Sequence, residues 1–519
     1  MDRLGKIMII AAVVMSLVLI VVLIFFLHGS LFGPKPGDQS VPAGTQGPVS
    51  IAAPENLLPK HLLIGKAAPP VVFSSSDGTS VSSEEIIQSS DNGMWFSFGS
   101  GQSASDYAAL AKAYNMTLVY VGDVPVEESD IMTVSDPGNV CYELWGLQTL
   151  PSDIVLSSDG RVLEFHAGAM NIGEAEGMLI RAKEGRDAVG FTFIEGTMSN
   201  GNGGFYTNTA VKGASPSGQD VLSESQGLVL WYALEKDNRA LFDLTWQFTK
   251  NNLLKNGIAS WYVGADGKTA NVNALLDDLR IWYALYQAGQ KWDGIYSEDA
   301  SAMLKAIKEL CLDKKSRLVD FTDLTNGKRA DTISLQYLDL VVLKAMAAED
   351  AEFEPVYQNV ENVLLDGRIS DEFPLYYKNY SYTTRTYDAG NLNTAEALYT
   401  LWNLSRAGML PEDAHDWLKE RVLAGTLGAR YRTNGEVVFG YDFHSTAVYG
   451  LAALIAHETG DDEMFESALR RMERKLVLDA NDPEFGAYTQ KNAVIYSFDQ
   501  LIPLLVNAVL DERLDHAGE

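Results

Sequence analysis

The chain has 519 residues, of which 46% are hydrophobic and 21% are charged, so we expect three or four domains and a mostly globular protein. Its net charge of −29 argues against DNA or another polyanion as a partner, because no basic patch is available to neutralise phosphates. The two cysteines, Cys141 and Cys311, lie far apart and the seven histidines are scattered, so we expect no disulfide framework, no metal site and no cofactor.

The N-terminus carries an apolar stretch without charge at residues 7–27. At about 1.5 Å per residue, this stretch can span a hydrocarbon core of roughly 30 Å. Arg3 and Lys6 precede it, which predicts a cytoplasmic N-terminus. The alternative is a cleaved signal peptide, but the stretch is long for that and no Ala-x-Ala site follows it. We therefore expect residues 1–28 to form a single-pass anchor in the cell membrane, with the rest of the chain outside the cell.

A tether and an α/β region are expected next. Residues 29–57 are rich in Gly, Pro, Ser and Ala, which predicts a flexible tether. Residues 58–186 alternate strand and helix signals, which is typical of an α/β layer fold. The expected strands are 93–98, 117–121 and 153–156, and the expected helix is 105–114.

The α/β region contains the segment Tyr142–Pro151, followed by a strand and an Asp-Gly turn in Ser157–Val162. These features are similar to the thioredoxin and peroxiredoxin-like family. The resemblance implies that Pro151 matches the family's cis-proline. Where the family has Cys-x-x-Cys, this chain has Ser100-Gly101-Gln102-Ser103, and serine cannot cycle between thiolate and disulfide. We expect a redox-inactive domain that serves as a spacer or a docking surface.

The remainder, residues 187–519, repeats a unit in which an acidic position precedes a long apolar helix. Units spaced by 53 to 57 residues predict six helix hairpins, which close most simply into an all-α (α/α)6 barrel. Carboxylates are favoured at helix N-termini, so the acids would converge at one end of the barrel. The alternative is that at least half of them only cap their helices. The six acids are Glu224, Asp278, Asp331, Asp388, Asp442 and Asp499.

This region holds three acidic elements: Ser223-Glu224-Ser225-Gln226-Gly227, Asp277–Leu285 and Tyr387-Asp388-Ala389-Gly390-Asn391. Together they resemble glycoside hydrolase family 8, the inverting endo-β-1,4-glucanase family. The resemblance implies that Glu224 is the general acid and Asp388 the general base, with Asp442 as the alternative base. As a general acid, Glu224 needs a raised pKa, which either burial or a neighbouring carboxylate such as Asp278 would provide; Asp278 would otherwise hold the sugar by its hydroxyls. Two positions depart from the family pattern: Leu276 replaces an acid, with Asp277 beside it, and Asn391 replaces an Arg.

Inverting hydrolysis needs two carboxyl groups about 6.5–9.5 Å apart, one protonated and one ionised, on opposite sides of the sugar. Aromatic and polar residues near the same rim would contact the sugar rings, although each aromatic could equally be a core residue. The residues expected to bind substrate are Tyr206, Trp261, Asp277, Trp282, Tyr387, Asn391 and Asp442.

Two functions follow from these elements. The first is an anchored hydrolase that cuts a β-linked, cellulose-like exopolysaccharide and accompanies the proteins that synthesise or secrete it. The second is a catalytically impaired protein that binds a glycan during export, which the departures at Leu276 and Asn391 favour. A third family joins a thioredoxin-like domain to an (α/α)6 barrel, but it keeps the redox cysteines that this chain lacks.

Overall fold

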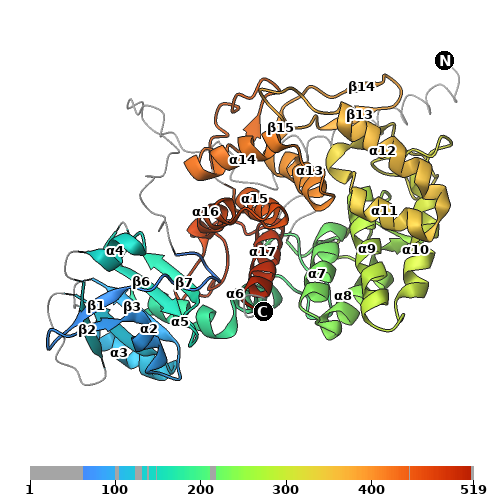
Figure 1. Cartoon of the computed structure of the whole chain (residues 1–519). Helices are drawn as coiled ribbons and strands as arrows, with labels where there is room; N and C mark the ends of the chain where they lie inside the picture. Colours follow the sequence, from blue (N-terminus) through green and yellow to red (C-terminus); the bar gives the residue numbers. More distant parts are fainter. Residues whose placement is uncertain are drawn as a thin grey trace, which may run out of the picture.

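The computed structural model describes residues 62–99, 104–122, 131–136, 139–147, 149–210, 218–443 and 445–515 (Figure 1). The expected anchor at 7–27, the expected tether at 29–57 and the Ser100–Ser103 segment lie outside these ranges. Within the ranges, no helix has both the length and the hydropathy that crossing a bilayer requires.

The N-terminal part is a seven-stranded sheet in the order β2-β1-β5-β4-β3-β6-β7. Strands β3, β4 and β5 run parallel, and the flanking strands pair antiparallel. The predicted strands and helix of this region are present. The strands are β1 Val72–Ser75, β2 Ser80–Ser82, β3 Met94–Phe98, β4 Thr117–Val121, β5 Met132–Ser135, β6 Ser152–Leu156 and β7 Val162–Ala167, and the helices are α2 Ser83–Gln88, α3 Ala104–Ala113, α4 Val140–Leu144 and α5 Ile172–Glu184.

Alternate side chains of β3 build the two cores of this domain. Trp95 packs with Tyr107 of α3 at 4.4 Å between ring centroids, on the face that α3 and α5 cover. Phe96 points to the other face and meets Trp145 edge-on at 5.3 Å. The Leu150–Pro151 peptide is cis, which is the geometry that the thioredoxin resemblance implies. The resemblance itself stays a prediction.

The second part is a ring of six inner helices (Figure 1). Each inner helix contacts the next, and α17 returns to contact α7, so the ring is closed. These helices are buried along most of their length, as α15 shows with eleven consecutive buried residues from Thr446 to Ala456. The inner helices are α7 Ser223–Glu235, α9 Leu275–Lys291, α11 Leu340–Glu349, α13 Thr394–Arg406, α15 Thr446–Thr459 and α17 Phe498–Asp515.

The outer layer closes the ring differently from the expected six sequential hairpins. Helices α8, α10, α12 and α16 pack on the inner helices that precede them, and α14 lies against α15 and α16. The outer partner of α17 is α6 (Arg186–Thr197), which precedes the first inner helix, so the last hairpin joins the two ends of the domain. The remaining outer helices are α8 Arg239–Asn252, α10 Ser297–Cys311, α12 Glu354–Asp366, α14 Glu412–Ala424 and α16 Asp462–Met472.

Short strands and turns decorate the ring, most of them where the inner helices begin. They are β8 Val221–Leu222, β9 Leu254–Lys255, β10 Ile258–Ala259, β11 Tyr262–Val263, β12 Thr332–Ser334, β13 Asn379–Ser381, β14 Thr386–Tyr387, β15 Leu392–Asn393 and β16 Arg430–Tyr431, with the 3-10 turns η3 Leu335–Tyr337, η4 Ala351–Phe353 and η5 Glu473–Lys475. The pairs β8–β11 and β15–β16 and the sheet β12-β13-β14 form a rim around the N-terminal end of the inner helices.

A buried ionic cluster joins the two parts of the molecule. Arg181 at the end of α5 and Arg186 at the start of α6 both contact Glu473 of η5, at 2.5 and 2.9 Å. Both also lie near Glu164 of β7, at 3.7 and 2.7 Å. Since each arginine is at most 5% exposed, the cluster fixes the α/β domain against the ring.

The cluster predicts a loss of stability for Glu473→Gln. Removing one carboxylate leaves two buried arginines that share Glu164, which costs about 3 kcal/mol of unfolding free energy. Urea unfolding of the full chain measures it. Glu463→Gln is the control, since Glu463 pairs with Lys419 at 69% exposure, and a change within about 0.5 kcal/mol is expected there. Equal stability of the two variants would contradict the role of the cluster.

Candidate active site

The first turn of α7 carries Glu224 at the N-terminal end of the ring, where the predicted box Ser-Glu-Ser-Gln-Gly begins. Ser223 donates from its hydroxyl to Asp277 Oδ2 at 2.5 Å, so the first residue of the box fixes a carboxylate from the neighbouring inner helix α9. The backbone N–H of Ser223 also bonds the carbonyl of Trp261 at 3.0 Å. Ser223 thus holds both Asp277 and the backbone of Trp261 next to the first turn of α7.

Two further side chains of the box fasten this turn to the rest of the ring. Ser225 and Ser497 share a hydroxyl hydrogen bond of 2.9 Å just before α17 begins. Gln226 donates to the carbonyl of Gly203 at 2.7 Å and accepts from the N–H of Phe205 at 2.9 Å. Both serve to hold the helix start in place, and neither was predicted from the sequence.

Gly227 lets an arginine lie across α7 beneath the carboxylates. A Cβ at this position would come within 3.0 Å of Arg280 Cδ. Arg280 donates to the hydroxyl of Tyr399 in α13 at 2.8 Å, lies 3.5 Å from Asp277 Oδ1 and reaches the carbonyl of Glu224 at 3.4 Å. This buried guanidinium therefore ties α9 to α7 and α13 directly under the site.

The environment of Glu224 favours its protonated form. Burial and, after it, the negative charge of Asp277 raise the pKa of Glu224 to about 7, against the opposing charge of Arg280. Burial also raises the pKa of Asp277, but the hydroxyl of Ser223 and the charge of Arg280 favour its ionised form. The pair thus holds a carboxylic acid beside a carboxylate near neutral pH.

The structure corrects the role expected of Asp278. Its side chain is fully buried and accepts from the N–H of Ala259 and from Asn273 Nδ2, both at 2.7 Å. Burial raises its pKa well above the ordinary value. Asp278 points into the wall between α9 and the rim, and its predecessor Asp277 faces Glu224, because one step along a helix rotates a side chain by about 100°. Leu276, which replaces an acid of the family pattern, is half-buried and packs against the core.

The predicted base Asp388 lies at the end of β14, on the exposed edge of the β12-β13-β14 sheet. Its carboxylate accepts from the N–H of Gly390 at 2.9 Å and from Asn379 Nδ2 at 3.5 Å. Its neighbour Tyr387 donates to the carbonyl of Val363 in the outer helix α12 at 2.8 Å, and stacks on a second tyrosine. Tyr387 is therefore held by the fold through its hydroxyl.

The other predicted binding residues divide into two groups. Trp282 is 1% exposed and donates from Nε1 to the carbonyl of Ala300, so it belongs to the core between α9 and α10 and its predicted contact with substrate is wrong. Trp261 and Tyr206 are half-buried beside the first turn of α7, and Asn391 and Asp442 are exposed. For these four, contact with substrate stays a prediction.

Sequence reasoning missed a second group of residues at the rim. Tyr337 ends η3, the turn that precedes the third inner helix. Burial raises the pKa of its hydroxyl well above the ordinary value, and the charges of Asp320, Asp277, Glu396 and Glu224 raise it further. Tyr337 is therefore near enough to Asp277 and Glu224 and to Asp320 and Glu396 for the charges of both groups to act on it.

Glu396 stands in the first turn of α13, as Glu224 does in the first turn of α7. Its Oε2 atom is buried and has no hydrogen-bond partner among the described residues. Burial raises the pKa of Glu396, while the charges of Lys378 and Arg430 lower it. The signal that could have found this residue is its place in the first turn of an apolar helix.

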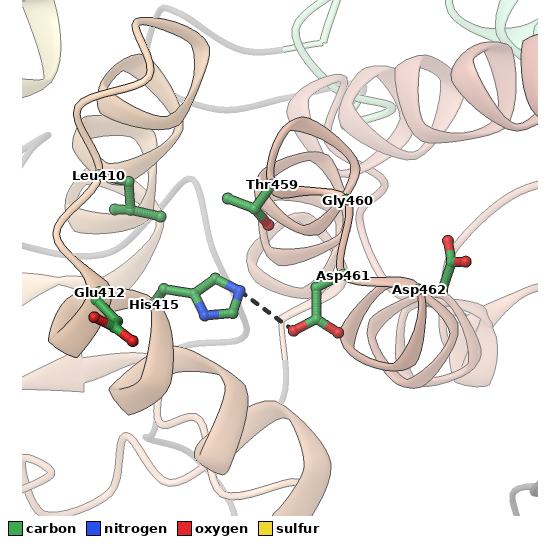
Figure 2. A pocket seen from close by; sticks show the side chains of 7 residues that line it. All are labelled: Leu410, Glu412, His415, Thr459, Gly460, Asp461 and Asp462. Atoms are coloured by element: carbon green, nitrogen blue, oxygen red, sulfur yellow. Dashed lines mark ion pairs between the residues drawn. The ribbon is translucent and has the colours of Figure 1, made fainter.

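One hollow in the described part of the chain lies away from these carboxylates. It encloses about 500 Å³ at the C-terminal end of α15, between the starts of α14 and α16. Figure 2 shows His415 and Asp461 facing each other across it, with Nε2 and Oδ2 3.3 Å apart. This is the opposite end of the inner helices from Glu224, so the hollow does not belong to the carboxylate site. Within the described ranges, no group of three His, Cys, Asp or Glu side chains is arranged to hold a metal ion.

The comparisons with known proteins agree with this arrangement. The profile of glycosyl hydrolases family 8 matches residues 200–316, which carry Glu224, Asp277 and Asp278. A structure described as a novel alpha-amylase from Clostridium perfringens is 30% identical and covers 62% of this chain and 97% of its own, with a TM-score of 0.59. The helical domain belongs to glycosyl hydrolase family 8. The chain is accordingly a glycoside hydrolase by family.

Two further relatives extend the comparison. The "Putative lipoprotein YdaJ" of Bacillus subtilis (strain 168) is 29% identical over 296 residues, which are 56% of this chain and 79% of that protein. The endo-beta-1,4-glucanase CMCax from Acetobacter xylinum is 17% identical, with a TM-score of 0.47 over 63% of this chain and 99% of its own. The second likeness is too distant to bear on the substrate.

Removing the charge beside the acid should shift the pH dependence of this domain. A general acid works only while protonated, so the alkaline limb of kcat/KM for the wild type should lie near pH 7, the pKa of Glu224. Asp277→Asn removes the charge that raises this pKa and leaves Arg280 to lower it. The alkaline limb is therefore expected at lower pH, measured by initial rates across pH 4–9. A limb that moves to higher pH would contradict the assignment.

Asp278→Asn should act on stability and leave the pH limbs in place. An amide offers one acceptor where the carboxylate offers two, and its NH₂ group would face Asn273 Nδ2 or the Ala259 N–H. The loss of one buried hydrogen bond costs about 1–3 kcal/mol in unfolding free energy. Thermal unfolding and the pH profile of the same preparation measure both effects. A shifted alkaline limb without loss of stability would restore the role that the sequence suggested.

Proposed function

We propose that the family 8 domain cleaves a polysaccharide by inverting hydrolysis, with Glu224 as the general acid. The observation that carries this proposal is the pair formed by Glu224 and Asp277: one carboxyl group is held protonated near neutral pH by burial and by the other's charge. In this scheme Glu224 protonates the leaving glycosidic oxygen, and Asp277 holds the sugar bound at the point of cleavage. A second, ionised carboxylate then activates water on the far side, for which Asp388 stays the sequence prediction.

Two linkages compete for the substrate. Family 8 membership favours the β-linked, cellulose-like polymer that the sequence suggests. The relative from Clostridium perfringens favours an α-linked glucan, because it is described as an alpha-amylase and this chain covers 97% of it at 30% identity. Both polymers present neutral pyranose rings, which suit the half-buried aromatics Trp261 and Tyr206.

We further propose that this hydrolase acts at the outer face of the cell membrane, in support of exopolysaccharide synthesis or secretion. The apolar stretch 7–27 supports the membrane location, and so does the name of the Bacillus relative, which calls it a lipoprotein. The α/β domain, fixed to the ring by the cluster around Glu473, would then stand between the carboxylate site and the tether that leads to the anchor.

The test uses the full chain in detergent with a panel that contains carboxymethyl cellulose, mixed-linkage β-glucan, xylan, amylose and glycogen. Release of reducing ends from at least one polymer is expected, and Glu224→Gln should lower it by about 10²–10⁴-fold. Glu420→Gln, an exposed change on the outer helix α14, is the matched control and should keep the wild-type rate. Binding without turnover by wild type and Glu224→Gln alike would instead identify a glycan-binding protein.

A further inference from the structure

The rim carries a carboxylate whose position suits the activation of water. Glu396 begins the fourth inner helix as Glu224 begins the first, and the hydroxyl of Tyr337 senses the charges of both. The first and fourth of six units lie on opposite sides of a closed ring. Glu396 therefore faces the mouth from the side opposite the general acid.

Local pairing gives Glu396 a positive surrounding. Strand β16 pairs Arg430 with Asn393, whose side chain caps α13 by accepting from the N–H of Ala395. Lys378 precedes β13, and its carbonyl accepts from the N–H of Leu335 at 3.0 Å. Both cations favour the ionised form of Glu396, whereas burial, which has the largest effect, and the charge of Asp320 raise its pKa.

The second observation is the unused oxygen. Glu396 Oε2 is shielded from solvent, yet no described donor reaches it. A buried carboxylate oxygen without a donor costs free energy, so such groups in native proteins call for an explanation. A water or a sugar hydroxyl bound in the mouth would supply the donor. Asp388, by contrast, already accepts from Gly390 and lies exposed on the edge of the sheet.

We propose that Glu396, and not Asp388, is the general base of the hydrolysis proposed above. The inference rests on that proposed function. In the reaction a water oxygen forms a bond to the anomeric carbon while one water proton passes to Glu396. The glycosidic C–O bond breaks, its electron pair stays on the leaving oxygen, and that oxygen takes the proton of Glu224. Solvent then removes the proton from Glu396 and returns one to Glu224.

A substrate whose leaving group needs no proton distinguishes the general acid, Glu224, from the general base, Glu396. The probe is β-cellobiosyl fluoride or α-maltosyl fluoride, whichever series the wild type cleaves. Glu224→Gln should recover on the fluoride to within about tenfold of the wild type, because fluoride departs unprotonated. Glu396→Gln should stay lowered by about 10²–10⁴-fold on both polymer and fluoride.

The pH profile of kcat/KM is a second test. A residue with a purely structural role would not change the position of its acidic limb. The base must be ionised, so wild-type kcat/KM falls as the pH drops through the pKa of Glu396. Glu396→Gln should lose this acidic limb in its residual activity, and Asp388→Asn should keep it. The charged and titratable groups around Glu396 that could share the limb are Lys378, Arg430, Asp320 and Tyr337.

Each outcome decides the assignment. Thermal unfolding shows whether Glu396→Gln is folded, and Glu420→Gln controls for the substitution. If the variant does not fold, Glu396→Asp replaces it and should keep measurable turnover with an acidic limb. Recovery of Glu396→Gln on the fluoride, or loss of the acidic limb in Asp388→Asn, overturns the proposal and leaves Glu224 as the acid. A wild type without turnover on every polymer overturns the proposed function instead.

Discussion

The proximity of Glu224 and Asp277 is the constraint on which the rest of the site depends. Two carboxyl groups that lose water on folding cannot both stay ionised without a large cost in free energy. Ser223 donates to Asp277 and Arg280 lies beside it, so the negative charge stays there and the proton stays on Glu224. The same guanidinium reaches Tyr399 in α13, so the fourth unit supports the first two.

The way in which the ring closes explains how the α/β domain is joined to it. The outer helix α6 comes from the start of the domain and packs on α17 at its end. Arg186 begins α6 and Arg181 lies in the last turn of α5, and both pair with Glu473 of η5. The contact between the two domains therefore lies where α6 and α17 close the ring. Movement of the α/β domain would disturb this closure.

Much of the helical domain could be predicted, because inner helices touch neighbours on all sides and their apolar runs recur at a nearly constant spacing. The predictions fail where a shift of one residue along a helix changes the direction in which a side chain points. Asp277 and Asp278 are adjacent, and only the rotation of α9 tells which faces Glu224. Trp282 lies one turn further along the same helix, on the side that faces α10.

Glu396 was missed for a different reason. Resemblance pointed to Asp388, which precedes α13 by six residues, and the intervening β15 carries the chain from the sheet edge to the helix start. A spacing counted along the chain cannot show that a strand intervenes between an acid and its helix. Asp499, another of the six acids predicted from the repeat, has a structural role. It accepts from the N–H of Ala447 and so caps the neighbouring inner helix α15.

The charges at the mouth are better suited to moving protons than to attracting a substrate. The chain is strongly acidic, yet Lys378 and Arg430 lie by the fourth unit and Arg280 lies beneath the first two. A neutral glycan gains little from such a mixed field, because it carries no net charge to be steered. The field does separate the acids, since Glu224 has a negative neighbour and Glu396 has positive ones. Burial and the nearby acids, Glu224 and Glu396 among them, raise the pKa of Tyr337 well above the ordinary range, so its hydroxyl stays protonated near neutral pH. A sugar ring placed over that hydroxyl would have a proton donor on one side and a proton acceptor on the other, which is the arrangement that hydrolysis with inversion requires.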